Sequence, residues 1–148
     1  MAEIGFYHLL STPLGRALPR LLERAVGQGH RVVVRAGSAE RVEHLTALLW
    51  TYDEAGFLPH GSGRDGNAAA QPIWLTHEEE NPNAASILFL VDGVGADDLS
   101  GFVRCIDMFD GNDLDAVEAA RGRWRAAGAA GHTLTYWQQT EKGWEKKV

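Results

Sequence analysis

Residues 86–91 form a short segment in which every side chain after Ser86 is apolar. A strand with one face in water alternates apolar and polar side chains, whereas an uninterrupted apolar run is typical of a strand that is buried on both faces. Such strands occur in parallel sheets that carry helices on both sides. The segment therefore predicts an α/β domain in which this strand lies near the centre of the sheet.

The rest of the chain alternates between strand patterns and helix patterns. Runs at 3–9 and 31–36 flank a segment whose leucines recur at spacings of three and four, which predicts a βαβ unit with parallel strands. Thr12 and Ser38 are the predicted caps of the first two helices, and Asp113 or one of its neighbours is the predicted cap of the last. Further strands are expected at 73–75, 86–91, 102–109 and 133–138, and further helices at 38–50 and 114–130. We expect a single domain of residues 1–148 with six strands, three main helices and a mostly parallel sheet between two helical layers.

Residues 51–71 are expected to be irregular, and their glycine-rich part, residues 61–66, is expected to be mobile. This part spells the dinucleotide pattern G-x-G-x-x-G. The pattern binds a pyrophosphate only between a strand and a helix N-terminus, and neither adjoins it here. No G-x-x-x-x-G-K-[ST] sequence is present either. The sequence thus predicts an α/β fold without a nucleotide-binding glycine motif and without a nucleotide cofactor.

The residue patterns of metal sites and catalytic sites are incomplete. His77 opens a sequence like that of zinc proteases, but Asn81 stands where the second histidine must bind the metal. Cys105 is the only cysteine, and we interpret it as a buried strand residue. We expect no metal, no other cofactor and no catalytic residue. An enzyme whose active site is assembled from distant loops stays open as an alternative.

The formal net charge of −6 argues against direct DNA binding, because phosphate contacts depend on concentrated lysine and arginine. Basic residues do gather in the segment 121–125 and in the tail after residue 141, so a small basic site is compatible with the sequence. No apolar run approaches the ~18 residues that a membrane span requires, and the first residues lack the features of a secretory signal. We therefore expect a cytoplasmic protein without a membrane partner.

Two segments carry large side chains that the sequence pattern does not assign to the hydrophobic core. The first begins at Trp50, where a predicted helix ends, and continues to Phe57, Pro59 and His60 in the following loop. Aromatic side chains in a loop indicate either a loop that folds back with Trp50 in the core or a docking surface. Docking is favoured because aromatic residues are the usual anchors of protein interfaces.

The second segment is the last predicted helix. Val117, Arg121 and Trp124 are spaced by four and three residues and therefore share one face, and Arg125 lies one turn beyond Arg121. One reading is that Val117 and Trp124 pack on the sheet while the arginines lie at its solvent edge. The other is a pocket, because a tryptophan beside a guanidinium offers an apolar wall and a bidentate carboxylate clamp. A peptide that ends in phenylalanine has both matching groups.

In order and spacing, several motifs resemble the chi subunit family of bacterial DNA polymerase III, an accessory component tied to the clamp loader. The matching motifs are Phe6-Tyr7, Gly29-His30-Arg31-Val32, Leu49-Trp50, Phe57-Leu58-Pro59-His60 and the helix end at 121–131. The resemblance spans nearly the whole chain. It implies a Rossmann-like three-layer fold without catalytic activity and without nucleotide binding.

The resemblance also implies two partners. Chi proteins contact the psi subunit on one surface, and the residues that match there are Trp50 and Phe57, with Pro59 and His60 as neighbours. They contact the acidic C-terminal tail of single-stranded DNA-binding protein on another surface. This tail ends in Pro-Phe. The matching residues are Arg121 for the terminal carboxylate and Trp124 for the phenylalanine.

This chain departs from the family at two places. Val117 stands where a lysine occurs in well-known members, which removes one charge from the tail-binding region, and Arg125 is the candidate to compensate. Residues 139–148 extend past the usual end, either as a short amphipathic tail or as an additional edge strand.

The resemblance implies a non-catalytic replication subunit that links the clamp loader to single-stranded DNA-binding protein. The psi subunit is not recognisable in every bacterium that has chi, so the partner at Trp50 is psi, another clamp-loader protein or a helicase. The alternatives are a small α/β enzyme with a dispersed site and a helicase-associated DNA-repair adaptor.

Overall fold

The structure is a computed structural model that describes residues 3–52, 59–63, 65–96 and 98–148. The strands of the described part are β1 (Glu3–Leu9), β2 (Val32–Arg35), β3 (Gly61–Ser62), β4 (Ile73–Thr76), β5 (Ile87–Leu90), β6 (Arg104–Asp110), β7 (Thr133–Thr140) and β8 (Gly143–Lys146). Its helices are α1 (Leu14–Gly27), α2 (Ala39–Thr51) and α3 (Leu114–Ala129), with a short 3₁₀ turn, η1 (Ala68–Ala70).

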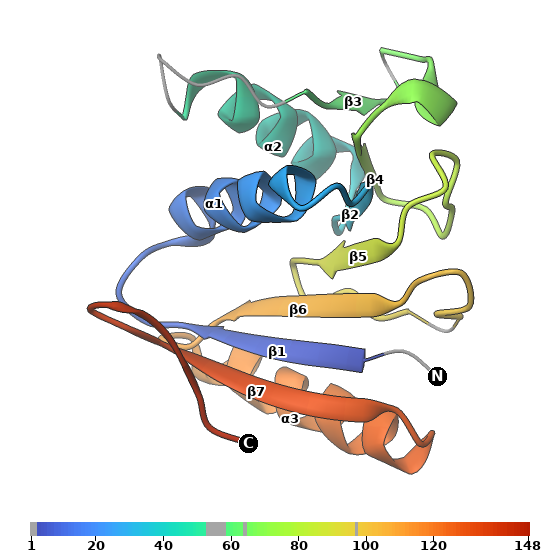
Figure 1. Ribbon diagram of the computed structural model, residues 1–148. Coiled ribbons are helices and arrows are strands. Elements are labelled where there is room, and N and C mark those ends of the chain that lie inside the picture. Colours follow the sequence, from blue (N-terminus) through green and yellow to red (C-terminus); the bar gives the residue numbers. More distant parts are fainter. Residues whose placement is uncertain (1–2, 53–58, 64, 97) are drawn as a thin grey trace.

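The strands form one sheet in the order β3-β4-β2-β5-β6-β1-β7-β8. Every pairing up to β7 is parallel, and only the last, between β7 and β8, is antiparallel. The predicted mostly parallel sheet is thereby confirmed, and so is the central place of β5 between β2 and β6 (Figure 1). β1 and β2 are parallel as predicted, although β5 and β6 lie between them.

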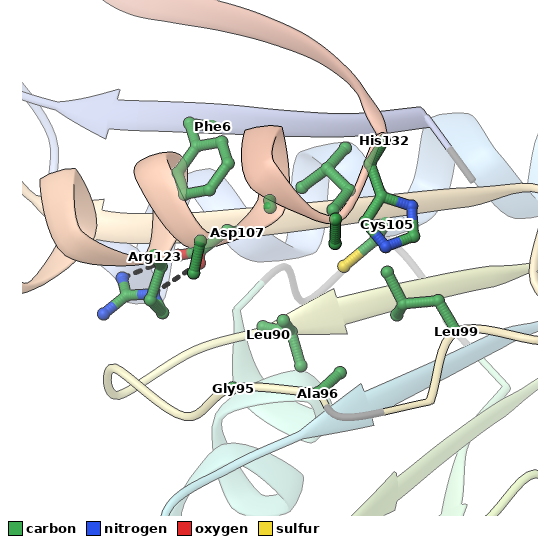
Figure 2. A pocket seen from close by; sticks show the side chains of 13 residues that line it. Phe6, Leu90, Gly95, Ala96, Leu99, Cys105, Asp107, Arg123 and His132 are labelled. Atoms are coloured by element: carbon green, nitrogen blue, oxygen red, sulfur yellow. Dashed lines mark hydrogen bonds and ion pairs between the residues drawn. The ribbon is translucent and has the colours of Figure 1, made fainter. Parts of the chain in front are cut away.

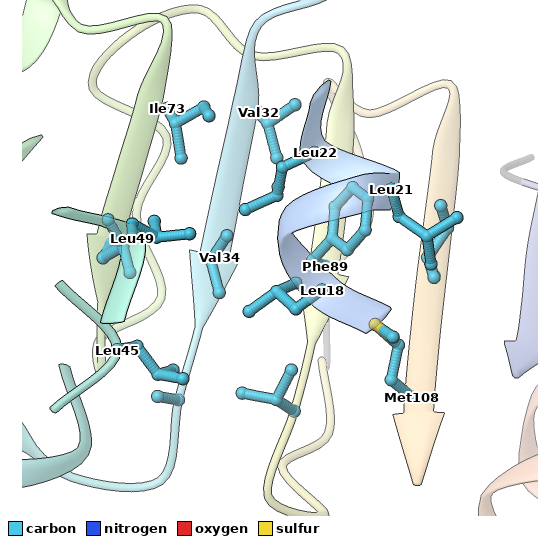
Figure 3. Close-up of a cluster of buried hydrophobic side chains, with 14 of the residues drawn as sticks. Leu18, Leu21, Leu22, Val32, Val34, Leu45, Leu49, Ile73, Phe89 and Met108 are labelled. Carbon is cyan, nitrogen blue, oxygen red and sulfur yellow. The ribbon is translucent and has the colours of Figure 1, made fainter. Parts of the chain in front are cut away.

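Helices cover both faces of the sheet, as the uninterrupted apolar strands require. Val32 and Val34 of β2 pack with Phe89 and the leucines of α1 and α2 on one face (Figure 3). Val33 and Leu88 join a second cluster on the other face, which α3 covers. Since all three valines of β2 are fully buried, these three positions of the strand must be apolar. This is the three-layer α/β/α arrangement expected from the sequence.

The helix starts follow the predictions in two cases out of three. The Ser38 hydroxyl accepts the backbone N–H of Arg41, and the Asp113 carboxylate accepts those of Asp115 and Ala116. The prediction for Thr12 is wrong, because Pro13 occupies the cap position of α1 and no side chain caps that helix. The Thr12 hydroxyl instead accepts a hydrogen bond from the side-chain amide of Gln139.

Gln139 also fills the turn between β1 and α1. Its side-chain oxygen accepts the backbone N–H groups of Leu10, Ser11 and Thr12 at 2.9, 2.9 and 3.0 Å. In dinucleotide-binding folds the amides of this first turn hold a phosphate group. Here the oxygen of a neutral side chain, carried by β7, accepts these three N–H groups.

The sequence predictions missed β3 and gave β8 only as one of two alternatives. The Gly61 to Gly66 loop was expected to be mobile, but Gly61 and Ser62 pair with Trp74 and Leu75 as β3. A Cβ atom on Gly61 would lie 2.5 Å from the Gln71 side chain, which would have to move if Gly61 were replaced. Residues 143–146 form β8, which settles the question left open for 139–148 in favour of an edge strand.

No helix in the described part of the chain combines the length and the apolar character that crossing a membrane requires.

Candidate partner-binding surfaces

A cavity of about 430 Å³ lies between α3 and the sheet, and we call it the α3 cavity. It is lined by Phe6, Phe109, Val117, Ala120, Arg121, Trp124, Tyr136, Gln138, Lys147 and Val148. The α3 residues of this set are spaced by three and four positions, so one helix face forms that side. The rest comes from β1, β6, β7 and the residue pair after β8. The structure therefore unites the sequence-predicted Val117, Arg121 and Trp124 in one concave site.

Aromatic rings make up the floor of the α3 cavity. The ring of Trp124 meets the ring of Phe6 edge-on at a centroid distance of 5.3 Å and that of Tyr136 at 5.9 Å. Phe109 packs against Tyr136 at 6.3 Å. Such edge-to-face contacts fix the orientation of the rings and add to the apolar area that they bury. A half-buried Trp124 thus presents a rigid apolar surface to any side chain that enters.

Arg121 lies at the rim of this floor. Its side chain is 67 % exposed, and its guanidinium is 3.7 Å from the Glu118 carboxylate. An exposed ion pair of this kind contributes less than about 1 kcal/mol, so a ligand carboxylate can replace Glu118 at little cost. The charge of Arg121 also affects Tyr136. Burial raises the pKa of the Tyr136 hydroxyl, and the positive charge of Arg121 opposes that shift.

The other two arginines that the structure describes on α3 have different surroundings. Arg125 is 68 % exposed, lies 4.0 Å from Glu118 and is not among the residues that line the α3 cavity. Arg123 forms two hydrogen bonds to the Asp107 carboxylate on β6, at 2.7 and 3.0 Å. Arg121 is therefore the α3 arginine that faces the cavity.

The residues of the first predicted surface lie at the end of α2. Trp50 is 58 % exposed, so it is not a core residue as the folded-back reading required. Its ring packs against the ring of buried His60 at a centroid distance of 4.8 Å, and Pro59 beside it is half-buried. Phe57 lies outside the described residues. We call Trp50, Pro59 and His60 the Trp50 surface. It belongs to a part of the fold distant from α3 (Figure 1).

A second cavity, of about 330 Å³, lies between α3 and the segment that follows β5 (Figure 2). It contains the Asp107–Arg123 pair, Cys105 and His132. Burial raises the pKa of the Cys105 thiol to about 12, so the reactive thiolate is scarce at neutral pH. Burial also raises the pKa of Asp107, and Arg123 opposes this shift. The Asp107–Arg123 pair connects α3 to β6. No cluster of three metal-ligating side chains occurs among the described residues.

Sequence reasoning missed the strand residues of the α3 cavity. Phe6, Phe109 and Tyr136 come from three strands that are far apart in the chain but adjacent in the sheet. Lys147 belongs to the basic tail after residue 141, and the sequence did not predict where in the fold this tail lies. The sequence held no signal for this convergence, because it depends on the strand order.

Comparisons with known proteins match most of the chain, including α3. The model of the family described as DNA polymerase III chi subunit, HolC, matches residues 1–135. A protein of Rickettsia prowazekii (strain Madrid E), named "Probable DNA polymerase III subunit chi", is 35 % identical over 91 residues. The aligned part is 62 % of this chain and 55 % of that protein, so the chain spans about half the length of this relative. The family match includes α3 and ends inside β7, before Tyr136 and β8.

Proposed function

The chain belongs to the DNA polymerase III chi subunit family, and on this premise we propose that it is a non-catalytic accessory subunit of the replicative polymerase. In this role it links the clamp loader to single-stranded DNA-binding protein. One contact uses the α3 cavity, and the other uses the Trp50 surface.

The observation that carries the proposal is the combination of an aromatic floor with an exposed guanidinium in the α3 cavity. The acidic tail of single-stranded DNA-binding protein ends in Pro-Phe with a free carboxylate. Its terminal phenylalanine matches the apolar wall formed by Trp124 and Phe6, and its carboxylate matches the fork of Arg121. This combination of an aromatic surface and a guanidinium suits a peptide whose C-terminal residue is aromatic.

The Trp50 surface serves the second contact. An exposed tryptophan that rests on a buried histidine ring is positioned before binding, which reduces the entropy that an interface must overcome. The partner is a clamp-loader protein of the psi type or, in a repair complex, a helicase. Because DNA coated with single-stranded DNA-binding protein presents many tails, even a weak tail contact raises the local concentration of polymerase.

The test is a titration of the protein with a fluorescent peptide that carries three aspartates followed by Pro-Phe and a free carboxylate. Arg121→Ala removes the proposed clamp and is expected to cost about 1.5–3 kcal/mol of binding free energy, since the lost bond is charge-assisted. Arg125→Ala is the matched control, because its side chain is equally exposed and faces the same Glu118. Absence of binding by the unaltered protein, or an equal loss in the two variants, would contradict the proposal.

A further inference from the structure

The α3 cavity is completed by residues that lie beyond the part of the chain matched by the family. In the β7–β8 hairpin, Trp137 is opposite Lys146. The backbone N–H of Lys147 then donates to the carbonyl oxygen of Tyr136 at 2.7 Å, which continues the pairing by one residue. This bond holds Lys147 and Val148 against the cavity. The hairpin therefore gives the cavity a wall that residues 1–135 do not supply.

The cations that border the α3 cavity come from two different elements. Among its described lining residues, α3 contributes Arg121 and the hairpin contributes Lys147. The Lys147 side chain is 42 % exposed, and its Nζ atom lies 3.3 Å from a Glu145 carboxylate oxygen. Val117 on α3 lines the same cavity without a charge. Within the described part of the chain, the carboxylates that pair with these two cations, Glu118 and Glu145, are both exposed, so a more favourable anion can replace them.

We propose that Lys147 is a second cationic ligand of the α3 cavity and that it binds an acidic side chain of the peptide whose terminal carboxylate binds Arg121. This inference rests on the proposed function and extends it to β8. An ammonium group on a flexible stem suits carboxylates whose position varies, whereas the rigid guanidinium fork suits the fixed terminal carboxylate. The hairpin thus supplies the positive charge that Val117 lacks.

The experiment compares the full-length protein with Lys147→Gln in fluorescence anisotropy titrations at 50 and 200 mM NaCl. The probes are the peptide with three aspartates before Pro-Phe and a second peptide in which asparagine replaces each aspartate. We expect Lys147→Gln to bind the acidic peptide about three- to tenfold more weakly at low salt, with a smaller loss at high salt because salt screens exposed charges. Lys146→Gln is the matched control, because adjacent side chains of an extended segment point in opposite directions and Lys146 does not line the cavity.

The asparagine peptide separates recognition from a structural effect. If Lys147 binds an acidic side chain, the unaltered protein and Lys147→Gln bind the asparagine peptide with equal affinity. If the substitution distorts the cavity instead, the variant binds both peptides more weakly. The inference is overturned if Lys147→Gln and Lys146→Gln bind the acidic peptide alike while Arg121→Ala still loses affinity, and the proposed function then stands. If the unaltered protein binds neither peptide, the proposed function and the inference both fall.

Discussion

The replacement Arg123→Ala tests what holds α3, and with it the α3 cavity, on the sheet. In the folded protein the Arg123 guanidinium donates two hydrogen bonds to the Asp107 carboxylate, at 2.7 and 3.0 Å. The Asp107 side chain is 3 % exposed and that of Arg123 is 18 % exposed. Removing one partner of such a buried pair leaves an uncompensated charge, which typically costs about 3–5 kcal/mol. We expect this loss in the free energy of unfolding at pH 7, measured by urea denaturation.

The loss should depend on pH, and its sign follows from Asp107. Burial raises the pKa of this carboxyl, and Arg123 opposes the rise, so the variant has a folded-state pKa further above the unfolded value. A carboxyl with a raised pKa binds its proton more readily in the folded state. The destabilisation is therefore complete above the folded-state pKa of the variant and shrinks as the pH falls toward the folded-state pKa of the unaltered protein, below which Asp107 is protonated in both. Denaturation at pH 7 and pH 5 measures this trend.

Two controls make the result specific. Arg125→Ala removes an exposed arginine two positions along the same helix and should change the stability by about 0.5 kcal/mol or less. Arg123→Ala combined with Asp107→Asn removes the titrating carboxyl at position 107, so the pH dependence of the loss should disappear. The reasoning is refuted if Arg123→Ala is no less stable than Arg125→Ala, or if its loss is the same at both pH values.

Two further predictions concern other parts of the fold. Gln139→Ala removes the acceptor of three backbone N–H groups in the β1–α1 turn. It should lower the free energy of unfolding, measured by urea denaturation, by about 1–3 kcal/mol. An unchanged free energy of unfolding would mean that water replaces the side chain as acceptor. Trp50→Ala should change stability by about 1 kcal/mol or less, because the side chain is largely exposed, and should abolish co-purification with the clamp-loader partner while tail-peptide binding is kept. A joint loss of both activities would contradict two separate surfaces.

The sequence predicted those parts of the fold in which one physical requirement dominates. A strand that is buried on both faces must be apolar at every position, so β5 and the three-layer arrangement could be read directly. The short β3 could not, because Gly61 and Ser62 have little strand propensity and pair with β4 through tight packing against Gln71. β8 could be given only as one of two alternatives for residues 139–148, since its residues show no alternation and the strand depends on pairing with β7.

The same distinction applies to the α3 cavity. Helical spacing alone placed Val117, Arg121 and Trp124 on one face of α3. The opposing wall could not be predicted, because Phe6 and Tyr136 meet only when β1 lies next to β7, and no local pattern encodes that order. For a site that combines one helix face with several strands, the sequence therefore predicts the residues of the helix face but not those of the strands.

The positions of the two surfaces decide what kind of link the proposed subunit can be. The Trp50 surface follows α2, which packs on one face of the sheet, and the α3 cavity lies on the other face. Between them lie strands that are buried on both faces and closely packed. A ligand in one site makes no contact with the other, and coupling requires an element with two discrete arrangements. We therefore expect a rigid tether in which the clamp-loader partner and the tail bind independently, so that occupancy at the replication fork is governed by the number of tails within reach.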